Sequence, residues 1–273
     1  MAGISLRDYQ TDAVERMKNG CILCGGVGSG KSRTALAYYY KQNGGKLGTK
    51  NYIRMPGTPK DLYIITTARK RDTLEWEGEL SPFLLSVHAE VNTYKNKVVV
   101  DSWNNIGKYA TVTDAFFIFD EQRVVGSGAW VKAFLKIAKF NEWILLSATP
   151  GDTWEDYIPV FVANGFYKNR TAFKEEHMVM TWVNGKYPKV NRYLGVGRLI
   201  RLRNRILVDM DFKRETCSHH EDVYVSYDVA KYKETSRLRW NPYKNEPIVN
   251  AGELCYVSVS YTHLRAHETR SNL

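Results

Sequence analysis

The chain has 273 residues, of which 44% are hydrophobic and 13% aromatic, so it can bury a sizeable core as one large domain or two small ones. Its formal net charge of +10 favours a polyanionic partner such as nucleic acid, although charge alone does not distinguish such a protein from a generic basic one. No run reaches the ~20 apolar residues of a membrane span, and the N-terminus lacks the apolar core of a secretory signal. We therefore expect a cytoplasmic protein.

The four cysteines give two weak signals of metal or redox chemistry. Cys21 and Cys24 form a C-x-x-C pair, but no second pair follows at zinc-ribbon spacing, and both lie in a short apolar run. We interpret them as small buried residues. Cys217 precedes a His-His pair, for which a solvated loop is the better interpretation.

The first predicted elements are a helix, a strand and a second helix. Ser5 is a plausible N-cap for an amphipathic helix that ends at Asn19-Gly20. The apolar run 21–24 predicts a buried strand, and 32–39 predicts a helix. Gln10, in the first helix, carries an amide that both donates and accepts, so it is a candidate to recognise an adenine edge.

The stretch Gly25-Gly26-Val27-Gly28-Ser29-Gly30-Lys31-Ser32 lies between that strand and that helix and fits the phosphate-binding pattern G-x-x-x-x-G-K-[ST]. The glycines let successive N–H groups point at an anion, Lys31 would reach the β- and γ-phosphates, and Ser32 would offer its hydroxyl to Mg²⁺. The alternative is a glycine turn without a ligand, which the complete match disfavours. The predicted nucleotide-binding residues are Gln10, Gly25, Gly26, Gly28, Ser29, Gly30, Lys31, Ser32 and Arg33.

Residues 41–60 predict a long basic loop, and 62–66 predict the next strand, followed by a helix over 69–80. Because ligands of parallel α/β sheets bind at the carboxyl ends of strands, Thr67, Arg69 and Lys70 are placed where a backbone phosphate could bind. Strands over 87–93 and 97–100 follow, and Ser102 is either a helix cap or a further phosphate contact.

The apolar run 115–119 predicts a buried parallel strand that ends in Asp120-Glu121. In this place Asp120 would hold Mg²⁺ through its water shell, and Glu121 would take the proton from an attacking water. The alternative is a solvated acidic turn. A helix over 130–140 and a strand over 143–146 come next, and Ser147 and Thr149 then supply hydroxyls that would connect the nucleotide site to a second surface.

Beyond Pro150 the pattern weakens. Residues 154–163 predict a helix, 169–189 an irregular basic segment, and 198–205 a dense basic stretch that is either a nucleic-acid contact or a solvated face. Residues 221–225 alternate as a strand does, and 230–240 predict a helix.

These motifs together resemble the superfamily 2 helicases and translocases of the DEAD/DEAH-box type, most closely a phage-type relative of the chromatin-remodelling translocases. The stretch from Leu6 to Gln10 resembles the family's adenine-reading glutamine motif, and the phosphate loop matches motif I. Thr66 to Arg69 resembles motif Ia, and Val100 to Trp103 resembles motif Ib.

The later motifs follow in the family's order. Asp120 and Glu121 stand at motif II, but Gln122 and Arg123 replace the usual Ala-Asp or Ala-His, which leaves the subclass of box open. The Ser147–Thr149 stretch resembles motif III, which in the family couples hydrolysis to movement.

The resemblance implies a RecA-like P-loop NTPase lobe, with a mostly parallel α/β sheet and helices on both faces, that uses ATP and Mg²⁺ to move on DNA. It implies catalytic roles for Lys31, Asp120 and Glu121, and contacts from Thr67, Arg69 and Ser102 to the DNA backbone. Such contacts are tolerant of sequence and sensitive to salt. If the protein is phage-encoded, its place is the host cytoplasm.

On this basis residues 1–210 form the ATP-binding lobe, and 211–257 begin the connection to a second RecA-like lobe that the family carries in cis and this chain lacks. Residues 258–273 resemble a non-native tail of translated sequencing adapter. Two alternatives stay open. One is a phage DNA-packaging ATPase, and the other is a nucleotide- and DNA-binding fragment without turnover, because loss of an arginine finger costs ~10³–10⁵ in rate.

Overall fold

The computed structural model describes residues 2–121, 124–183, 187–212, 229–241, 244–249 and 253–254. The chain divides into two compact units, residues 1–213 and 214–273, and each is considered by itself. The predicted strand over 221–225, the Cys217 segment, Gln122, Arg123 and the tail 258–273 lie outside the described residues.

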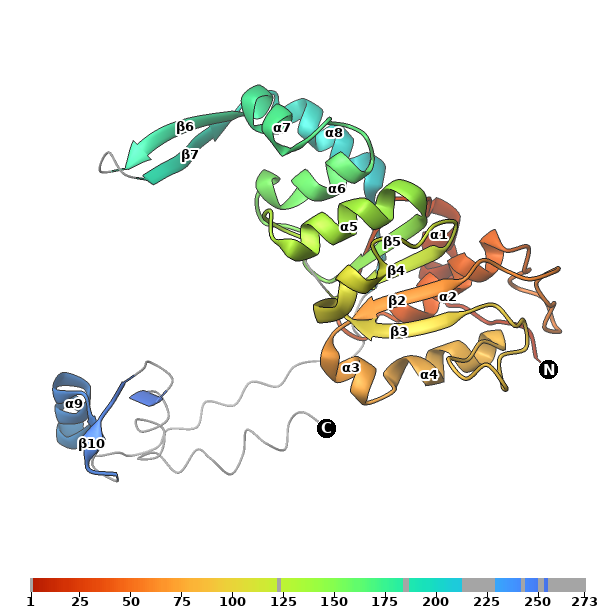
Figure 1. Ribbon diagram of the computed structural model, residues 1–273, viewed down its shortest axis with the longest axis horizontal. Coiled ribbons are helices and arrows are strands. Elements are labelled where there is room, and N and C mark those ends of the chain that lie inside the picture. Colours follow the sequence, from red (N-terminus) through yellow and green to blue (C-terminus); the bar gives the residue numbers. More distant parts are fainter. Residues whose placement is uncertain are drawn as a thin grey trace. The chain divides into compact units, whose positions relative to one another are not determined.

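The first unit is built on a six-stranded sheet in the order β3-β2-β4-β5-β1-β8 (Figure 1). All of the neighbouring strands in this sheet run parallel. The strands are β1 (Ile22–Cys24), β2 (Leu62–Thr66), β3 (Val98–Ser102), β4 (Phe116–Asp120), β5 (Glu142–Ser147) and β8 (Leu207–Asp209). The central strands are short apolar runs because both of their faces are buried.

Side chains of successive strand residues alternate between two hydrophobic clusters, one on each face of the sheet. Ile64 and Ile118 belong to the first cluster, and Ile65 and Phe119 to the second. The first cluster includes residues of α1 (Asp8–Arg16), α2 (Lys31–Gln42) and α4 (Glu75–Leu80). The second includes residues of α5 (Ala129–Phe140), α6 (Ile158–Ala163), α7 (Arg170–His177) and α8 (Val196–Ile206). The predicted α/β sheet with helices on both faces is confirmed.

The register brings the carboxyl ends of the strands to one edge of the sheet. Thr66 pairs with Ser102, Asp120 with Leu146, and Cys24 with Ser147. The loops that leave this edge carry the phosphate loop, the Thr66–Arg69 and Val100–Trp103 stretches, Asp120-Glu121 and the Ser147–Thr149 stretch, which are distant from one another in the sequence. The fold therefore concentrates these motifs in one place.

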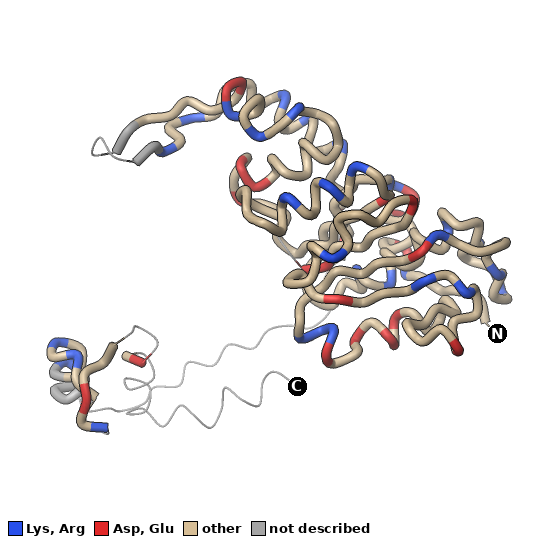
Figure 2. The backbone as a smooth tube through the Cα atoms, in the orientation of Figure 1, with Lys and Arg blue, Asp and Glu red and all other residues tan. Residues whose placement is uncertain are grey.

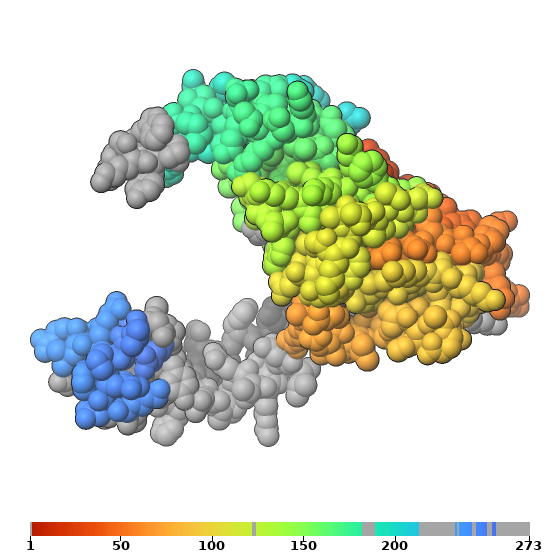
Figure 3. All heavy atoms as spheres, in the orientation of Figure 1, coloured from red at the N-terminus to blue at the C-terminus, as the bar shows by residue number. Residues whose placement is uncertain are grey.

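The long basic loop after α2 is held by tyrosine hydroxyls. Tyr40, fully buried in α2, donates to the carbonyls of Ile53 and Lys46. Tyr52, within the loop, donates to the carbonyl of Phe83, in the short 3₁₀ helix η1 (Ser81–Phe83). The space-filling view shows the loop and this neighbouring segment side by side on the surface (Figure 3).

Three predicted elements differ from the structure. The helix expected over 69–80 divides into α3 (Ala68–Asp72) and α4, because Leu74 takes a left-handed backbone conformation with φ of 56°. The strand expected over 87–93 is a series of turns, in which the Ser86 hydroxyl accepts from the His88 N–H at 3.1 Å. Hydrogen bonds from side chain to backbone of this kind compete with a strand.

The third difference is the segment 169–189, which was expected to be irregular. Asn169 caps α7 by accepting from the Ala172 N–H, and an antiparallel pair follows, β6 (Met178–Val183) and β7 (Tyr187–Tyr193). In the sequence, an Asn-Gly dipeptide separates the two strands, and it is a strong hairpin signal that an irregular segment does not account for.

The remaining short elements of the first unit are η2 (Trp103–Tyr109) and η3 (Trp154–Tyr157). The second unit holds α9 (Val229–Leu238), close to the helix predicted there, and the antiparallel pair β9 (Trp240–Asn241) and β10 (Glu246–Pro247). Among the described residues, none of the helices combines the length and the apolarity needed to cross a bilayer.

Candidate nucleotide-binding site

The phosphate loop connects β1 to α2 at the carboxyl edge of the sheet. Gly28 and Gly30 have φ of 81° and 76°, a left-handed conformation that a side chain would oppose. The Lys31 ammonium donates to the carbonyl oxygens of Gly25 at 2.7 Å and Gly26 at 3.0 Å. Burial lowers the pKa of Lys31, and the nearby Asp120 carboxylate opposes that shift. The side chain of Lys31 is thus folded back onto the backbone of its own loop.

Gln10 packs beneath this loop. Its side chain is 7% exposed, its carbonyl oxygen accepts from the Arg7 N–H at 2.9 Å, and its amide nitrogen lies 3.5 Å from the carbonyls of Ser29 and Gly30. A Cβ at Gly30 would lie 2.4 Å from that nitrogen, so glycine is needed there for this contact as well. The neighbouring Tyr9 hydroxyl also donates to the Ser29 carbonyl, at 3.2 Å. Gln10 and Tyr9 together support the loop from α1.

Asp120 and Glu121 follow β4 and are placed differently. Asp120 is 1% exposed, and its carboxylate accepts from the Thr66 hydroxyl at 2.8 Å. Burial raises the pKa of Asp120, and its contacts with Lys70 and Thr66 oppose the shift. Glu121 is half-exposed and has a left-handed backbone with φ of 56°, a strained conformation of the kind found at functional sites.

Lys70, on α3, lies against both acids. Its ammonium nitrogen is 3.1 Å from Asp120 Oδ2 and 2.7 Å from Glu121 Oε1. Burial lowers the pKa of Lys70, but the two carboxylates outweigh it, and the net shift is upward. The sequence placed Lys70 near a nucleic-acid phosphate and did not predict this pairing. The sequence carries no signal for it, because the pairing depends on β2 lying beside β4, which brings the start of α3 next to Asp120 and Glu121.

The end of β5 contacts both the phosphate loop and the loop that begins at Glu121, through its backbone. The Ser147 carbonyl accepts from the Gly25 N–H at 3.2 Å, and the Leu146 carbonyl accepts from the Glu121 N–H at 3.2 Å. The Ser147 hydroxyl accepts from the Thr149 N–H at 3.1 Å. The phosphate loop is therefore bonded to the Ser147–Thr149 stretch itself, and Glu121 to the residue just before it.

These groups surround a cleft of about 700 Å³. The hydroxyl of Ser32 and the carboxylates of Asp120 and Glu121 are hard oxygen ligands of the kind that Mg²⁺ prefers. The ammonium of Lys70 shows that a cation fits between the two acids. The cleft is lined by Val27, Gly28, Gly30, Lys31, Ser32, Lys70, Glu75, Glu79, Asp120, Glu121, Ser147, Ala148 and Thr149.

Arg33 has a partner that the sequence did not predict. It pairs with Glu79 of α4 at 2.7 Å, so its guanidinium is directed to α4. Cys21 is fully buried, as predicted, and burial raises its pKa to about 11. Cys24 is half-buried, and its pKa is raised in the same way. Among the described residues, there is no cluster of three metal-ligating side chains of the His, Cys, Asp or Glu type.

The predicted DNA-contact residues lie beside the cleft. Thr67 caps α3 by accepting from the Lys70 N–H at 3.3 Å, and Arg69 is exposed. Ser102, in contrast, is 2% exposed, and its hydroxyl accepts from Arg71 at 3.3 Å. Arg71 also pairs with Asp101 at 3.3 Å, so this guanidinium covers Ser102.

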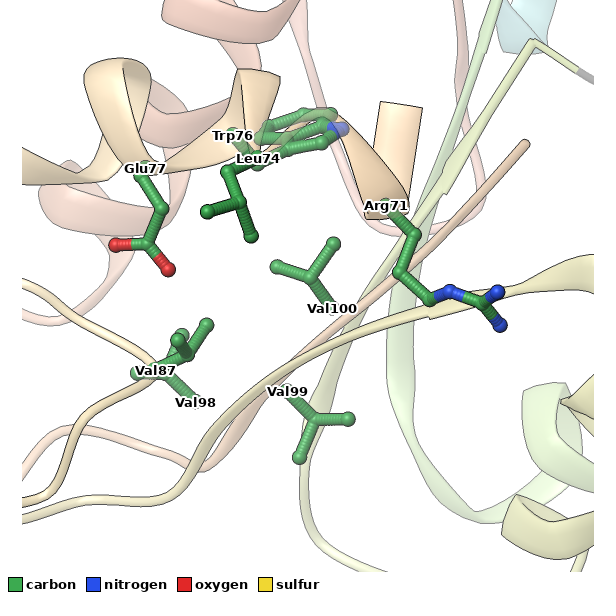
Figure 4. A pocket seen from close by; sticks show the side chains of 8 residues that line it. All are labelled: Arg71, Leu74, Trp76, Glu77, Val87, Val98, Val99 and Val100. Carbon is green, nitrogen blue, oxygen red and sulfur yellow. The ribbon is translucent and has the colours of Figure 1, made fainter. Parts of the chain in front are cut away.

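A smaller cavity of about 270 Å³ lies at the β3 edge of the sheet, between that strand and the α3–α4 segment. Figure 4 shows that valine side chains from β3, with Val87, Leu74 and Trp76, line it, and that the guanidinium of Arg71 points away from them. The cavity is lined mainly by apolar side chains, with Glu77 and Arg71 beside them, and none of the predicted site residues lines it.

No family model matches the chain, and no curated protein matches it. Among solved structures it is similar to the Sulfolobus solfataricus SWI2/SNF2 ATPase core in complex with double-stranded DNA. The TM-score is 0.55 and the identity 15%, over 76% of this chain and 45% of that one. The first unit has a RecA-like fold.

Two further structures resemble this RecA-like lobe less closely. The Pyrococcus furiosus Hef helicase domain matches with a TM-score of 0.42 and 17% identity, over 67% of this chain and 43% of that one. A nuclease-deletion mutant of the restriction-modification enzyme LlaGI, in complex with a DNA substrate mimic, matches with a TM-score of 0.38 and 15% identity. That match covers 55% of this chain and 18% of that one. The chain thus spans less than half the length of each of these proteins.

Proposed function

We propose that this RecA-like lobe is the ATP-binding motor lobe of a DNA helicase or translocase. The observation that carries the proposal is the meeting, in one cleft of about 700 Å³, of the phosphate-loop lysine, the Asp120–Glu121 pair and the end of β5. The fold likeness to a SWI2/SNF2 ATPase core supports the same proposal. The cytoplasm, or the host cytoplasm for a phage protein, is the proposed location.

Each residue of the cleft has a separate role in this proposal. Lys31 exchanges the carbonyls of Gly25 and Gly26 for the β- and γ-phosphates of ATP, and Ser32 and Asp120 hold Mg²⁺. Mg²⁺ supplies charge neutralisation at the transferred phosphoryl group. Glu121, half-exposed at the mouth of the cleft, accepts the proton of the attacking water. Gln10 supports the loop from below, and a contact with adenine would require its amide to leave the carbonyls of Ser29 and Gly30.

The DNA contacts are proposed to lie on α3 and the neighbouring end of β3. Figure 2 shows basic positions on α3, of which Arg69 is exposed. Because Arg71 covers Ser102, we propose that a phosphate at this end of β3 meets the guanidinium, with Ser102 and Asp101 holding it in place. Thr67, the N-cap of α3, is proposed as a further contact to the DNA backbone. These contacts carry no sequence information, and their strength falls with added salt.

We further propose a second RecA-like lobe in cis in the complete protein, which would supply the arginine finger. The SWI2/SNF2 structure is more than twice as long as the part that this chain matches. Ser147 and Thr149 are placed to report the state of the cleft to such a lobe, because β5 bonds to both the phosphate loop and motif II.

Steady-state ATP hydrolysis with and without duplex DNA, measured on the chain extended by the proposed second lobe, tests the proposal. We expect hydrolysis that DNA stimulates, and we expect Glu121→Gln to lower the rate by about 10²–10⁴-fold while nucleotide binding persists, since only the proton acceptor is lost. Nucleotide and DNA binding without hydrolysis would instead favour the binding-module alternative. Hydrolysis that DNA does not affect would contradict the motor function.

A further inference from the structure

Lys70 occupies the position that the metal–nucleotide complex needs. Its ammonium bridges Asp120 and Glu121 at 3.1 and 2.7 Å, and it lines the same cleft as Lys31 and Ser32. With the cleft in this state, two lysines neutralise it, Lys31 on the loop carbonyls and Lys70 on the acids. A divalent cation that reaches the acids meets an ammonium already bound there.

The side chain of Lys70 also lies beside a second pair of acidic residues, Glu75 and Glu79. A small cavity of about 90 Å³ is lined by Lys70 itself together with Ser32, Trp76 and the carboxylates of Glu75 and Glu79 on α4. Glu75 is exposed and Glu79 is partly buried beside Arg33. The backbone of Lys70 is fixed meanwhile, because its N–H donates to the Thr67 cap. The ammonium can therefore change partners by rotation of its side chain alone.

The electrostatics of the cleft favour such a change when metal arrives. A cation with two charges repels the ammonium, and the partly buried cleft screens that repulsion less than water does. Lys31 already feels Lys70, since the charge of Lys70 is one of the causes that lower the pKa of Lys31. Movement of Lys70 away from the acids also weakens its repulsion of Lys31.

We propose that Lys70 is a positioning residue that holds the Asp120–Glu121 pair until Mg–ATP binds and then moves to the carboxylates of Glu75 and Glu79. The proposal rests on the proposed function of the same cleft. It makes α3 the link between the two ligands, because α3 carries Lys70 in the cleft and the exposed Arg69 beside it. Nucleotide occupancy is thereby transmitted to the segment proposed to contact DNA.

The test is the affinity for a fluorescent ADP analogue, measured with and without Mg²⁺ at pH 8. Lys70→Met removes the competitor of the metal, so we expect binding with Mg²⁺ to tighten on the order of 3- to 10-fold, as for loss of one partly exposed ion pair. Binding without Mg²⁺ changes less. Lys70→Arg keeps the charge and clamps the acids with a planar fork, so we expect weaker binding with Mg²⁺ than in the wild type.

Lys60→Met is the matched control. Lys60 also bridges two carboxylates, Asp114 at 2.9 Å and Glu142 at 3.2 Å, but at the opposite, amino edge of the sheet. We expect its nucleotide affinity to equal that of the wild type. Equal or weaker Mg-dependent binding by Lys70→Met, in a wild type that binds, would overturn the Lys70 proposal alone. A wild type that binds no nucleotide would overturn the proposed function itself.

The consequence for DNA is measured with the same variants. In the wild type we expect Mg–nucleotide to change the affinity for a DNA duplex, because the positive charge of Lys70 leaves the acids and changes the electrostatic potential beside Arg69. In Lys70→Met this change is expected to fall at least several-fold, while DNA still binds through Arg69. An undiminished nucleotide effect in Lys70→Met would contradict the link through α3.

Discussion

The carboxyl group of Asp120 illustrates a cost that the fold accepts at its proposed metal site. Burial raises the pKa of Asp120, and the hydrogen bond from Thr66 and the charge of Lys70 only partly oppose this. The folded chain therefore holds the proton more tightly than the unfolded chain does. Stability associated with this group is lower above its folded pKa and is regained as the pH falls through that value.

We expect Asp120→Asn to raise the melting temperature by about 2–4 °C, corresponding to about 1 kcal/mol, while the Mg-dependent part of nucleotide binding is lost. Calorimetry at pH 7 measures the first change. Asp101→Asn is the control of opposite sign. Although burial opposes it, hydrogen bonds from Asn105 and Tyr109 and the contact with Arg71 hold the pKa of Asp101 below its usual value, so its replacement should lower stability. A lower melting temperature for Asp120→Asn would contradict this account.

At the scale of single residues, the sequence predicted the groups that form a motif and missed their partners. That Lys31, Asp120 and Glu121 lie at one edge of the sheet could be predicted, because each follows a buried strand that the sequence indicated. Lys70 could not be assigned to the acids, because its pairing depends on the side-by-side placement of β2 and β4. The cover of Arg71 over Ser102 depends in the same way on β2 lying beside β3.

At the scale of elements, the strands at the centre of the six-stranded sheet were predicted best. The strand over 62–66 has the bounds expected, because buried parallel strands are continuous apolar runs. The helix over 69–80 was wrong in its middle, since neither propensity nor spacing foretells the left-handed backbone of Leu74. The pair of strands β6 and β7 was missed because the Asn-Gly turn signal between them was not used.

The aromatic run in α2 leads to a prediction about the basic loop that follows it. The Tyr40 hydroxyl donates to the carbonyls of Ile53 and Lys46, and the Tyr40 ring contacts that of Tyr52 at 5.4 Å. Tyr40→Phe removes one hydrogen-bonding group and keeps the ring. A net loss of about 1 kcal/mol in loop closure corresponds to roughly five-fold faster tryptic cleavage at the lysines of 41–60.

Tyr63→Phe serves as the control for this measurement. Tyr63 is also buried, but it belongs to the cluster on the other face of the sheet, where its ring stacks on Phe117 at 4.8 Å. We expect cleavage of the loop in Tyr63→Phe to match the wild type. Unchanged cleavage in Tyr40→Phe would show that the hydroxyl does not anchor the loop.

At the scale of the whole molecule, the fold turns motifs that are distant in sequence into one site. The phosphate loop, α3, motif II and the end of β5 all leave the same edge of one parallel sheet. This convergence follows from strand direction alone, so it could be predicted once the strands were found. The net charge of +10 adds a general attraction to polyanions. The order of the strands within the sheet could not be predicted, because the sequence patterns do not encode it.

The measurement that tests the central claim most directly is a calorimetric titration of the wild type and Lys31→Ala with Mg–ATP. Lys31 is the cation that would leave the carbonyls of Gly25 and Gly26 for the phosphates, so we expect the wild type to bind one equivalent and the variant to bind at least ten-fold more weakly. An unfolding scan of both proteins serves as the control for folding. Equal binding by the two proteins would contradict a nucleotide site in this cleft.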